Sequence, residues 1–407
     1  MIELNALSNQ VAGKVQLSSS KSISNRLLIL SAMAKNNLKL SNLSDADDTK
    51  LLDQILSKPN LDSTIDCHHA GTTFRFLTAY LSTKEGLFKL CGSERMHQRP
   101  IAPLVDAINQ IGGEIEYLEK KGFPPLLIRG KQIIGGEISI TGDVSSQFIS
   151  ALLMIAPTLK KGLKLTIMPP ILSRPYIQMT LSLMKKVGIK HNWENNTIII
   201  ANQAYNEIDF TVENDWSSSS FLYSLASLSH KSTIEIPHLF KDSLQGDAFV
   251  SELYENLGVK TSYTYDGISI QKTEFQEEKL AFNLADYPDL ALPFAVSCLG
   301  LGIETHLTGL ESLKLKESDR LFTLQKELSK FNVRCEVDNH SIFIPKRQNI
   351  NYNNELIQTH HDHRIPMSIA PLCMKVGPIR FDDEHVVNKS YPSFWKDMET
   401  LGLSVKR

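Results

Sequence analysis

Hydrophobic residues recur at helical spacing in four segments of the chain, and each helical stretch passes into the alternation of apolar and polar positions typical of strands. The segments are Leu104–Ile128, Ile177–Ile200, Phe249–Ile270 and Leu321–Ile344. In the last, Leu321, Leu324, Leu328 and Phe331 are spaced to predict a helix with one buried face. The segments start roughly seventy residues apart, which suits a supersecondary module used several times.

Glycine and asparagine mark the predicted turns of this repeat. A left-handed residue is expected at each helix end, at Gly112-Gly113, Gly188, Gly258 and Asn332. Hairpin tips are expected at Asn195-Asn196, Asp266-Gly267 and Asn339. Helices that alternate with paired strands in repeated modules predict an α/β fold.

The most apolar runs, Phe148–Leu159 and Leu292–Ile303, are interrupted by Pro, Ser or Gly. Both are shorter than the roughly 18 residues that a membrane span needs, so we expect core helices and no membrane partner. Between Met1 and Val15 no basic stretch precedes an apolar run, so no signal peptide is expected. We therefore expect a cytoplasmic protein.

Composition limits the possible partners. The 407 residues carry a net charge of −2, with a pI near 6.6, so no long-range field favours nucleic acid or an anionic membrane. Any anion site must be local. The length exceeds what one core usually serves, and 42% hydrophobic residues can fill two, so we expect two domains. The five cysteines form no CxxC pair, so we expect reduced, buried thiols.

Charged and hydroxyl side chains gather at three predicted helix starts. The clusters are Lys316–Arg320 before the Leu321 helix, Ser18–Arg26 before the apolar run Leu27–Leu30, and Ala70–Arg75 before the predicted helix Phe76–Leu81. A helix start favours anions through its unpaired N–H groups and its dipole, and nearby Lys or Arg side chains add to this. For each cluster taken alone, the alternative is a solvated cap with surface ion pairs.

Shorter motifs repeat this combination of cations, hydroxyls and amides. They are Arg99 in Gln98-Arg99-Pro100, Ser145-Ser146-Gln147, Ser173 with Tyr176, Asp362-His363-Arg364, and Lys389 in Asn388-Lys389-Ser390. The chain resembles the enolpyruvyl transferase family, and within it the EPSP synthase branch. The motifs that carry this resemblance are, in chain order, KSISNR, AGTTFR, SSQF, SRPYI, LQGD, KESDR, DHR and NKSYP. The resemblance runs from Lys21 to Lys389, and KESDR with DHR is its most specific pair.

This resemblance implies an α/β fold of two similar domains. Each would consist of three βαβαββ units with helices inside and sheets outside, an inside-out α/β barrel, and the active site would lie in the interdomain cleft. We place the chain crossings near Ser18–Ser20 and Glu213–Trp216. The expected domains are therefore 20–214, which is continuous, and 1–19 with 215–407, which is discontinuous.

The reaction that the resemblance implies is transfer of the enolpyruvyl (1-carboxyvinyl) group of phosphoenolpyruvate to the 5-hydroxyl of 3-phosphoshikimate, with release of phosphate. It belongs to the shikimate pathway to chorismate and aromatic amino acids. No cofactor, metal or nucleic acid is implied, and a monomer is expected. Unit charges about 4 Å apart interact by roughly 4 kcal/mol at an effective dielectric near 20, so two phosphates and two carboxylates in one site require many cations.

Position within the motifs gives the implied roles. Lys21 and Glu317 would be the proton donors, and Asp289 would lie at the attacking hydroxyl. The expected 3-phosphoshikimate ligands are Lys21, Ser22, Arg26, Ser145, Ser146, Gln147, Ser173, Tyr176, Asp289, Ser312 and Lys316. The expected phosphoenolpyruvate ligands are Lys21, Gly71, Arg99, Gln147, Arg320, Arg364 and Lys389. For Asp289 taken alone, a helix N-cap after Pro288 is an equal alternative.

Four residues depart from the family pattern. His69 stands where the family often has Asn, and Ser312 stands where some members have Asn. Both side chains can still form hydrogen bonds. Phe74 and Phe76 are bulkier than the common residues, so sensitivity to phosphoenolpyruvate-competitive inhibitors does not follow from Gly71 alone.

Three alternatives stay open. UDP-N-acetylglucosamine enolpyruvyl transferases share the fold and the donor, but usually carry Lys-Asn where this chain has Lys21-Ser22, and a Cys in the stretch corresponding to Ser93–Arg99. A metal site is suggested by the histidines of 360–363 and 68–69, although Arg364 would repel a cation. A binding module without catalysis is the third, and the presence of all the implied catalytic residues argues against it. The nucleotide motifs GxxxxGK[ST] and GxGxxG do not occur.

Overall fold

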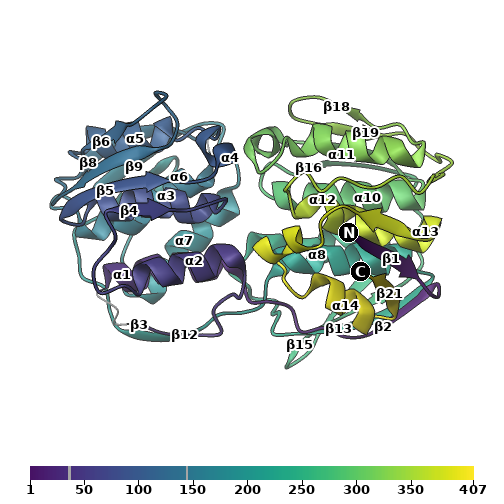
Figure 1. The fold of residues 1–407 in the computed structure, drawn as a ribbon. Helices are drawn as coiled ribbons and strands as arrows, with labels where there is room; N and C mark the ends of the chain where they lie inside the picture. Colours follow the sequence, from purple (N-terminus) through teal and green to yellow (C-terminus); the bar gives the residue numbers. More distant parts are fainter. Residues whose placement is uncertain (35–37, 144) are drawn as a thin grey trace. The chain divides into compact units, whose positions relative to one another are not determined.

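The computed structural model describes residues 1–34, 38–143 and 145–407. The chain forms two compact units, residues 21–212 and residues 1–20 with 213–407, which we call the continuous and the discontinuous unit (Figure 1). The sequence predicts domain boundaries between residues 19 and 20 and between 214 and 215, and the two units divide between 20 and 21 and between 212 and 213. Whether each unit folds by itself, as a domain would, stays a prediction.

Four sheets of the described residues, two in each unit, share one topology. Their first two strands are parallel with a helix between them in chain order, and in the module that contains β2 (Gln10–Lys14) the continuous unit is inserted before that helix. A second helix leads into an antiparallel hairpin whose last strand pairs with the second strand. Chain order within each is therefore βαβαββ. The predicted alternation of helix and paired strands is confirmed in all four segments that carried it.

In the continuous unit the first of these modules consists of β4 (Thr64–Asp66), α3 (Gly71–Ser82), β5 (Gly86–Cys91), α5 (Ala102–Gln110), β6 (Ile115–Tyr117) and β7 (Leu126–Gly130), with the short helix α4 (Glu94–His97) after β5. The second consists of β8 (Gly136–Thr141), α6 (Ser146–Ile155), β9 (Leu163–Met168), α7 (Arg174–Lys186), β10 (Asn192–Glu194) and β11 (Thr197–Ile200). A smaller third group pairs β3 (Leu38–Ser41) in parallel with β12 (Ile208–Thr211), beside α1 (Lys21–Met33) and α2 (Asp47–Leu56).

In the discontinuous unit the first module consists of β2 (Gln10–Lys14), α8 (Trp216–Leu228), β13 (Lys231–Pro237), α9 (Val250–Glu255), β14 (Val259–Tyr263) and β15 (Gly267–Lys272). The second consists of β16 (Lys279–Asn283), α10 (Ala291–Leu301), β17 (Glu304–Thr308), α11 (Arg320–Leu328), β18 (Glu336–Val337) and β19 (Ile342–Ile344). The third contains α12 (Arg364–Ile369), α13 (Cys373–Val376), β20 (Ile379–Phe381), α14 (Phe394–Thr400) and β21 (Leu403–Lys406).

The third module of the discontinuous unit is completed from the N-terminus of the chain. Strand β1 (Ile2–Ala6) lies between β20 and β21 and pairs antiparallel with both. A parallel bridge from Ile357 to Phe381 stands where the other modules have their first strand. The same strand order is thus reached with the last strand taken from the start of the chain, which ties that end into the unit.

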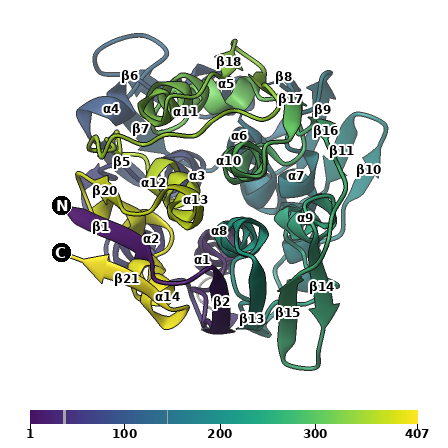
Figure 2. The same cartoon turned by 90° about the vertical axis from the view of Figure 1, so that its right-hand side faces the viewer.

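The first helix of each module is buried on nearly every side, whereas the second is amphipathic. In the discontinuous unit α8, α10 and α12 are seen nearly end-on with the sheets around them (Figure 2). Serine hydroxyls inside these helices donate back to their own backbone, as Ser219 does to Trp216 O (2.7 Å) and Ser297 to Pro293 O (2.8 Å). Such bonds satisfy polar groups that cannot reach water. The predicted α/β fold with inner helices and outer sheets is confirmed.

Two helices begin earlier than their apolar residues predicted. Helix α1 starts at Lys21 rather than Leu27, and α3 starts at Gly71 rather than Phe76. In α1 the polar residues are buried with partners of their own, since Ser24 Oγ accepts from Ser44 N at 2.9 Å. Hydrogen-bonded polar residues therefore extend these helices beyond the apolar runs that predict them.

Other local predictions are tested directly. Gly112, Gly188, Gly258 and Asn332 have positive φ, and the apolar runs starting at 148 and 292 are core helices, as predicted. All cysteines of the described residues are free, and four are buried while Cys91 is partly exposed. Within the described ranges, no helix combines the length and apolar character that crossing a membrane requires.

Candidate functional site

In the continuous unit, most of the expected ligands lie at the first turns of four helices. Lys21 opens α1, Gly71 opens α3, Ser146 opens α6, and Ser173 precedes α7 in a left-handed conformation with φ of 53°. A left-handed residue that is not glycine is uncommon and often occurs at functional positions. Helix starts carry unpaired N–H groups and positive dipole ends, so this placement favours anions.

Arg26 is the most buried cation of this group. Its Nε donates to Thr180 Oγ1 at 2.7 Å, and its Nη2 donates to Ser150 Oγ at 3.2 Å and to Tyr176 O at 3.4 Å. Its Nη1 donates to Ser22 O at 2.9 Å. Of the residues that the structure describes, none supplies a carboxylate to it, and burial lowers the pKa of Arg26 to about 10. Four of its five N–H groups are used, leaving one Nη1 hydrogen for a ligand.

Any side chain at position 71 would displace two guanidinium groups. A Cβ at this position would lie 2.5 Å from Arg99 Nη1 and 2.6 Å from Arg75 Nη1. Arg75 also donates to Gly71 O and to Gln147 Oε1, both at 3.0 Å, while Gln147 Nε2 donates to Thr72 Oγ1 at 2.9 Å. Three of the expected ligands, Gly71, Arg99 and Gln147, are therefore brought together around Arg75.

Three more expected ligands have partners of their own. Lys21 Nζ lies 3.3 Å from Asp48 Oδ2, and both side chains are largely buried. Ser145 caps α6 by accepting from Gln147 N at 3.4 Å. The Tyr176 carbonyl joins Arg26 to Thr180, whose Oγ1 donates to it at 2.9 Å.

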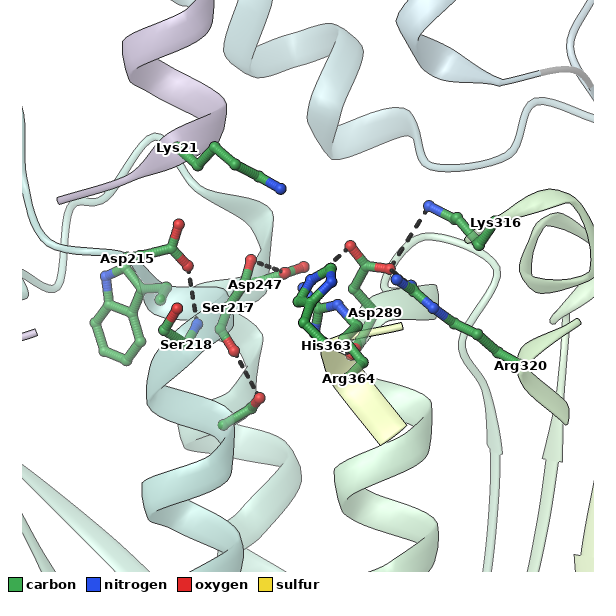
Figure 3. A network of polar contacts seen from close by, with 12 residues as sticks. Lys21, Asp215, Ser217, Ser218, Asp247, Asp289, Lys316, Arg320, His363 and Arg364 are labelled. Carbon is green, nitrogen blue, oxygen red and sulfur yellow. Dashed lines mark hydrogen bonds and ion pairs between the residues drawn. The ribbon is translucent and has the colours of Figure 1, made fainter. Parts of the chain in front are cut away.

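The discontinuous unit holds a compact ion-pair network (Figure 3). Asp289 Oδ1 lies 3.0 Å from Arg320 Nη1 and 3.6 Å from Lys316 Nζ, and its Oδ2 lies 3.3 Å from Arg364 Nη2. Glu317 Oε2 lies 2.8 Å from Arg320 Nη2, and its Oε1 lies 2.9 Å from Lys389 Nζ. The Arg320 side chain is only 3% exposed, so the alternative of a solvated surface cluster is wrong for this motif.

Asp362 is the fully buried anchor of the network. Its Oδ2 accepts from Arg320 Nε at 2.8 Å and from Ser318 Oγ at 3.0 Å, and its Oδ1 accepts from Arg364 N at 3.1 Å. Helix α11 begins only at Arg320, so Lys316 and Glu317 lie on an irregular segment before it. Asp289 lies in a 3₁₀ turn, and the residue before α10 is Leu290, so the N-cap alternative for Asp289 is wrong.

Burial and neighbouring charges shift the pKa values of the residues in this network, and the direction differs from residue to residue. Burial alone would raise the pKa of Asp289, but Arg364, Lys316 and Arg320 outweigh it and hold that pKa well below its usual range. Burial lowers the pKa of Lys316, with only partial compensation from Asp289. Burial also opposes the charge of Arg320, yet its acidic neighbours raise its pKa. Both Asp289 and Arg320 are therefore ionised at neutral pH.

Sequence reasoning missed the internal partners of these residues. Asp48, Ser150, Thr180 and Asp362 bind the expected ligands from distant parts of the chain. A buried cation needs an acid or several neutral acceptors, but nothing local in the sequence says which ones.

Ser312 Oγ is buried and has no hydrogen-bond partner among the described residues.

Comparison with known proteins identifies the group to which this chain is related. A family model described as EPSP synthase (3-phosphoshikimate 1-carboxyvinyltransferase) matches residues 6–58 and 56–398. A 3-phosphoshikimate 1-carboxyvinyltransferase of Bacteroides fragilis (strain YCH46) is 44% identical over 98% of this chain and 97% of the relative. The chain belongs to the EPSP synthase family. The family resemblance read from the motifs is thereby confirmed.

Other members of the EPSP synthase family extend this relation. The 3-phosphoshikimate 1-carboxyvinyltransferase of Haemophilus influenzae (strain PittEE) is 33% identical over 97% of both chains. The structure of EPSP synthase from Acinetobacter baumannii matches over the full length of both chains with a TM-score of 0.78 at 19% identity, which supports the fold. Among the described residues of this family member, no group of three or more His, Cys, Asp or Glu could hold a metal ion.

Proposed function

We propose that this chain transfers the enolpyruvyl group of phosphoenolpyruvate to the 5-hydroxyl of 3-phosphoshikimate, giving 5-enolpyruvylshikimate 3-phosphate and phosphate. The observation that carries the proposal is the compact cluster of Lys316, Arg320, Arg364 and Lys389 around Asp289 and Glu317 in a chain of this family. Together these side chains offer cations for a phosphate and a carboxylate, with acids beside them for proton transfer.

The 3-phosphoshikimate role rests on neutral donors and one buried cation. Ser145, Ser146, Ser173 and Tyr176 are assigned to its phosphate, and Ser22 with Arg26 to its carboxylate. Arg26 supports this assignment because its fixed guanidinium retains one N–H. The remaining proposed contacts come from Gln147, Ser312, Lys316 and Lys21. Of these, Lys21 and Gln147 would contact both substrates.

The phosphoenolpyruvate role rests on arginine and lysine. Arg320 and Arg364 are assigned to its carboxylate, since a planar guanidinium makes paired hydrogen bonds to carboxylates. Arg99 and Lys389 are assigned to its phosphate. Gly71 is assigned to close backbone approach, because a Cβ there would collide with Arg99.

Binding would exchange ion pairs within the site. Arg320 and Lys389 both hold Glu317. An arriving carboxylate would take Arg320 and an arriving phosphate would take Lys389. Glu317 would then lose both of these cations together, in a site that has gained negative charge. These are the conditions under which a carboxyl group takes up a proton, as a general acid must.

The proposed chemistry is an addition followed by an elimination. Glu317 and Lys21 supply a proton to the methylene carbon of phosphoenolpyruvate, while the 5-hydroxyl oxygen bonds to its central carbon and Asp289 takes the hydroxyl proton. The group that donated the first proton then takes one back from the new methyl group, which expels phosphate and restores the double bond. Nearby cations keep Asp289 ionised, as a base must be, and it becomes a stronger base once substrate anions draw those cations away from it.

Phosphate release tests the proposal with two acceptors. We expect release with phosphoenolpyruvate plus 3-phosphoshikimate, and none with phosphoenolpyruvate plus UDP-N-acetylglucosamine. Arg320→Lys keeps the charge but removes the paired hydrogen bonds, so it should lose most of the activity. Release with the nucleotide sugar alone would assign the chain to the other enolpyruvyl transferase reaction. Release with neither acceptor would refute the transfer altogether.

We also propose that the protein acts as a cytoplasmic monomer, without nucleic acid. The net charge of −2 supports the absence of a nucleic-acid partner, because it provides no long-range attraction for a polyanion. Sedimentation in the presence of both substrates tests the monomer.

A further inference from the structure

The histidine-rich segment before Arg364, which suggested a metal site in the sequence, is held by a buried acid instead. Glu327, on α11, is fully buried. Its Oε1 lies 2.7 Å from His360 Nε2, and its Oε2 accepts from Gln358 N at 3.0 Å. Lys330 Nζ donates to the same Oε2 at 2.5 Å and to Leu356 O at 2.8 Å. A buried carboxylate is retained only when it is paired, and here the partners come from the segment 356–360 and from Lys330.

Helix α11 therefore binds this segment at two points. Near its C-terminal end Glu327 contacts Gln358 and His360, and at its first residue Arg320 donates to Asp362. The two helix positions are separated by 7 residues, two helical turns or about 10.5 Å, and lie on the same face. The segment is attached along one side of the helix.

Between these attachments the backbone makes an unusual turn. His360 has a φ of 53° and His361 a φ of 54°, both in the left-handed region that L-residues with a Cβ rarely adopt. Asp362 N then donates to Thr359 O at 3.0 Å, and Arg364 N donates to Asp362 Oδ1 at 3.1 Å. A turn of this kind persists only when its surroundings hold it.

We propose that Glu327 is a positioning residue for the phosphoenolpyruvate carboxylate clamp. It acts through His360 and the Gln358 N–H, which fix the turn that places Arg364 beside Arg320. This inference rests on the proposed function in assigning those two arginines to phosphoenolpyruvate. Glu327 itself touches no substrate in the proposal.

The chain offers a matched pair of variants for the test. His360 and His361 are neighbours with nearly the same φ, but only His360 contacts Glu327, and His361 is exposed. Asn tolerates the left-handed region, so His360→Asn and His361→Asn change the backbone preference equally. His360→Gln is the rescue variant, because its longer side chain returns an amide N–H toward Glu327.

Steady-state kinetics with both substrates, together with thermal unfolding, supply the readouts. We expect His360→Asn to raise the KM for phosphoenolpyruvate about tenfold with little change in the KM for 3-phosphoshikimate, since small misplacements of a substrate clamp are costly. His361→Asn should match the native protein, and His360→Gln should recover most of the loss. Glu327→Gln should change the same constant in the same direction.

Two results would overturn the inference. One is an equal KM for phosphoenolpyruvate in His360→Asn and His361→Asn. The other is a lowered unfolding temperature in His360→Asn without any kinetic change, which would make the contact structural only. Loss of the proposed function is a separate outcome, because the native protein would then release no phosphate from phosphoenolpyruvate with either acceptor.

Discussion

Replacing Asp289 by Asn tests whether the ion-pair network stabilises the discontinuous unit as well as holding its cations in place. The change keeps the shape of the side chain and removes its charge. Lys316, Arg320 and Arg364 would all lose an acidic partner. The network now holds four cations, including Lys389, against three acids, so its formal charge would rise from +1 to +2.

The distances set the scale of the effect. At an effective dielectric near 20, the three contacts of 3.0, 3.3 and 3.6 Å sum to about 15 kcal/mol of gross attraction. Most of this offsets the desolvation of buried charges, and removing one partner of such a pair usually costs about 3–5 kcal/mol. Arg320 keeps Asp362 and Glu317, so we expect about 3 kcal/mol. For a unit of about 200 residues this corresponds to roughly 6–12 °C in the unfolding temperature.

The pH dependence identifies charge as the cause. The pKa of Asp289 is depressed in the folded state, so its stabilisation is complete above the unfolded value near 3.9 and is lost as pH falls below it. Urea unfolding of the native protein and Asp289→Asn should differ by a constant free energy from about pH 5 to 8. The difference should shrink toward the lowest pH at which the native protein stays folded.

Glu278→Gln is the matched control for Asp289→Asn. Glu278 also contacts two cations, Lys346 and Arg347, but its side chain is 58% exposed, so its loss should change stability little. An Asp289→Asn protein as stable as the native protein at pH 7 would refute the reasoning. So would a difference that persists unchanged in acid, because it would then not come from the carboxylate charge.

Three further substitutions test the proposed chemistry in steady-state assays. Glu317→Gln should lower kcat by roughly 10²-fold while 3-phosphoshikimate binding changes little, and a loss of stability alone would make it a structural carboxylate. Gly71→Ala should raise the KM for phosphoenolpyruvate at least about tenfold, because its Cβ would displace the Arg99 and Arg75 guanidinium groups, and unchanged kinetics would contradict the close packing. For His69→Asn the measurement is the KM for phosphoenolpyruvate from about pH 6 to 8, beside that of the native protein. A protonated His69 would donate to the substrate phosphate, so the native KM should be the lower one at pH 6 and the two values should converge as pH rises. Parallel curves would show that His69 only replaces Asn.

The sequence predicted the repeated module because its signals are local. Periodic leucines such as Leu321 and Leu324 and turn residues such as Gly188 and Asn332 report the geometry of a few neighbouring residues, and the structure confirms them. The predicted first residues of helices lie C-terminal to the observed ones, because polar residues such as Ser24 belong to helices only through tertiary hydrogen bonds. Hydrophobic periodicity cannot register these bonds.

The expected site residues were found through motif resemblance, but their surroundings were not. Glu327 lies in none of the motifs that marked the site in the sequence, yet it is fully buried and paired with residues 31 and 33 positions away. The third small group of the continuous unit, with only β3 and β12 among the described residues, gave no repeat signal in the sequence. Long-range pairing of charges depends on the assembled fold, and a single sequence contains no direct record of it.

The two units stabilise a buried arginine in different ways, and the difference affects how each arginine would bind an anion. Arg26 is held by hydroxyl and carbonyl oxygens, and burial lowers its pKa, with no acid among the described residues to compensate its charge. Arg320 is held by three acids, which raise its pKa. An anion that binds Arg26 gains a poorly compensated cation directly, whereas an anion that binds Arg320 must displace an internal carboxylate. The displaced acid is then Glu317 or Asp289, so binding at Arg320 is coupled to release of the groups proposed to move protons, and binding at Arg26 is not.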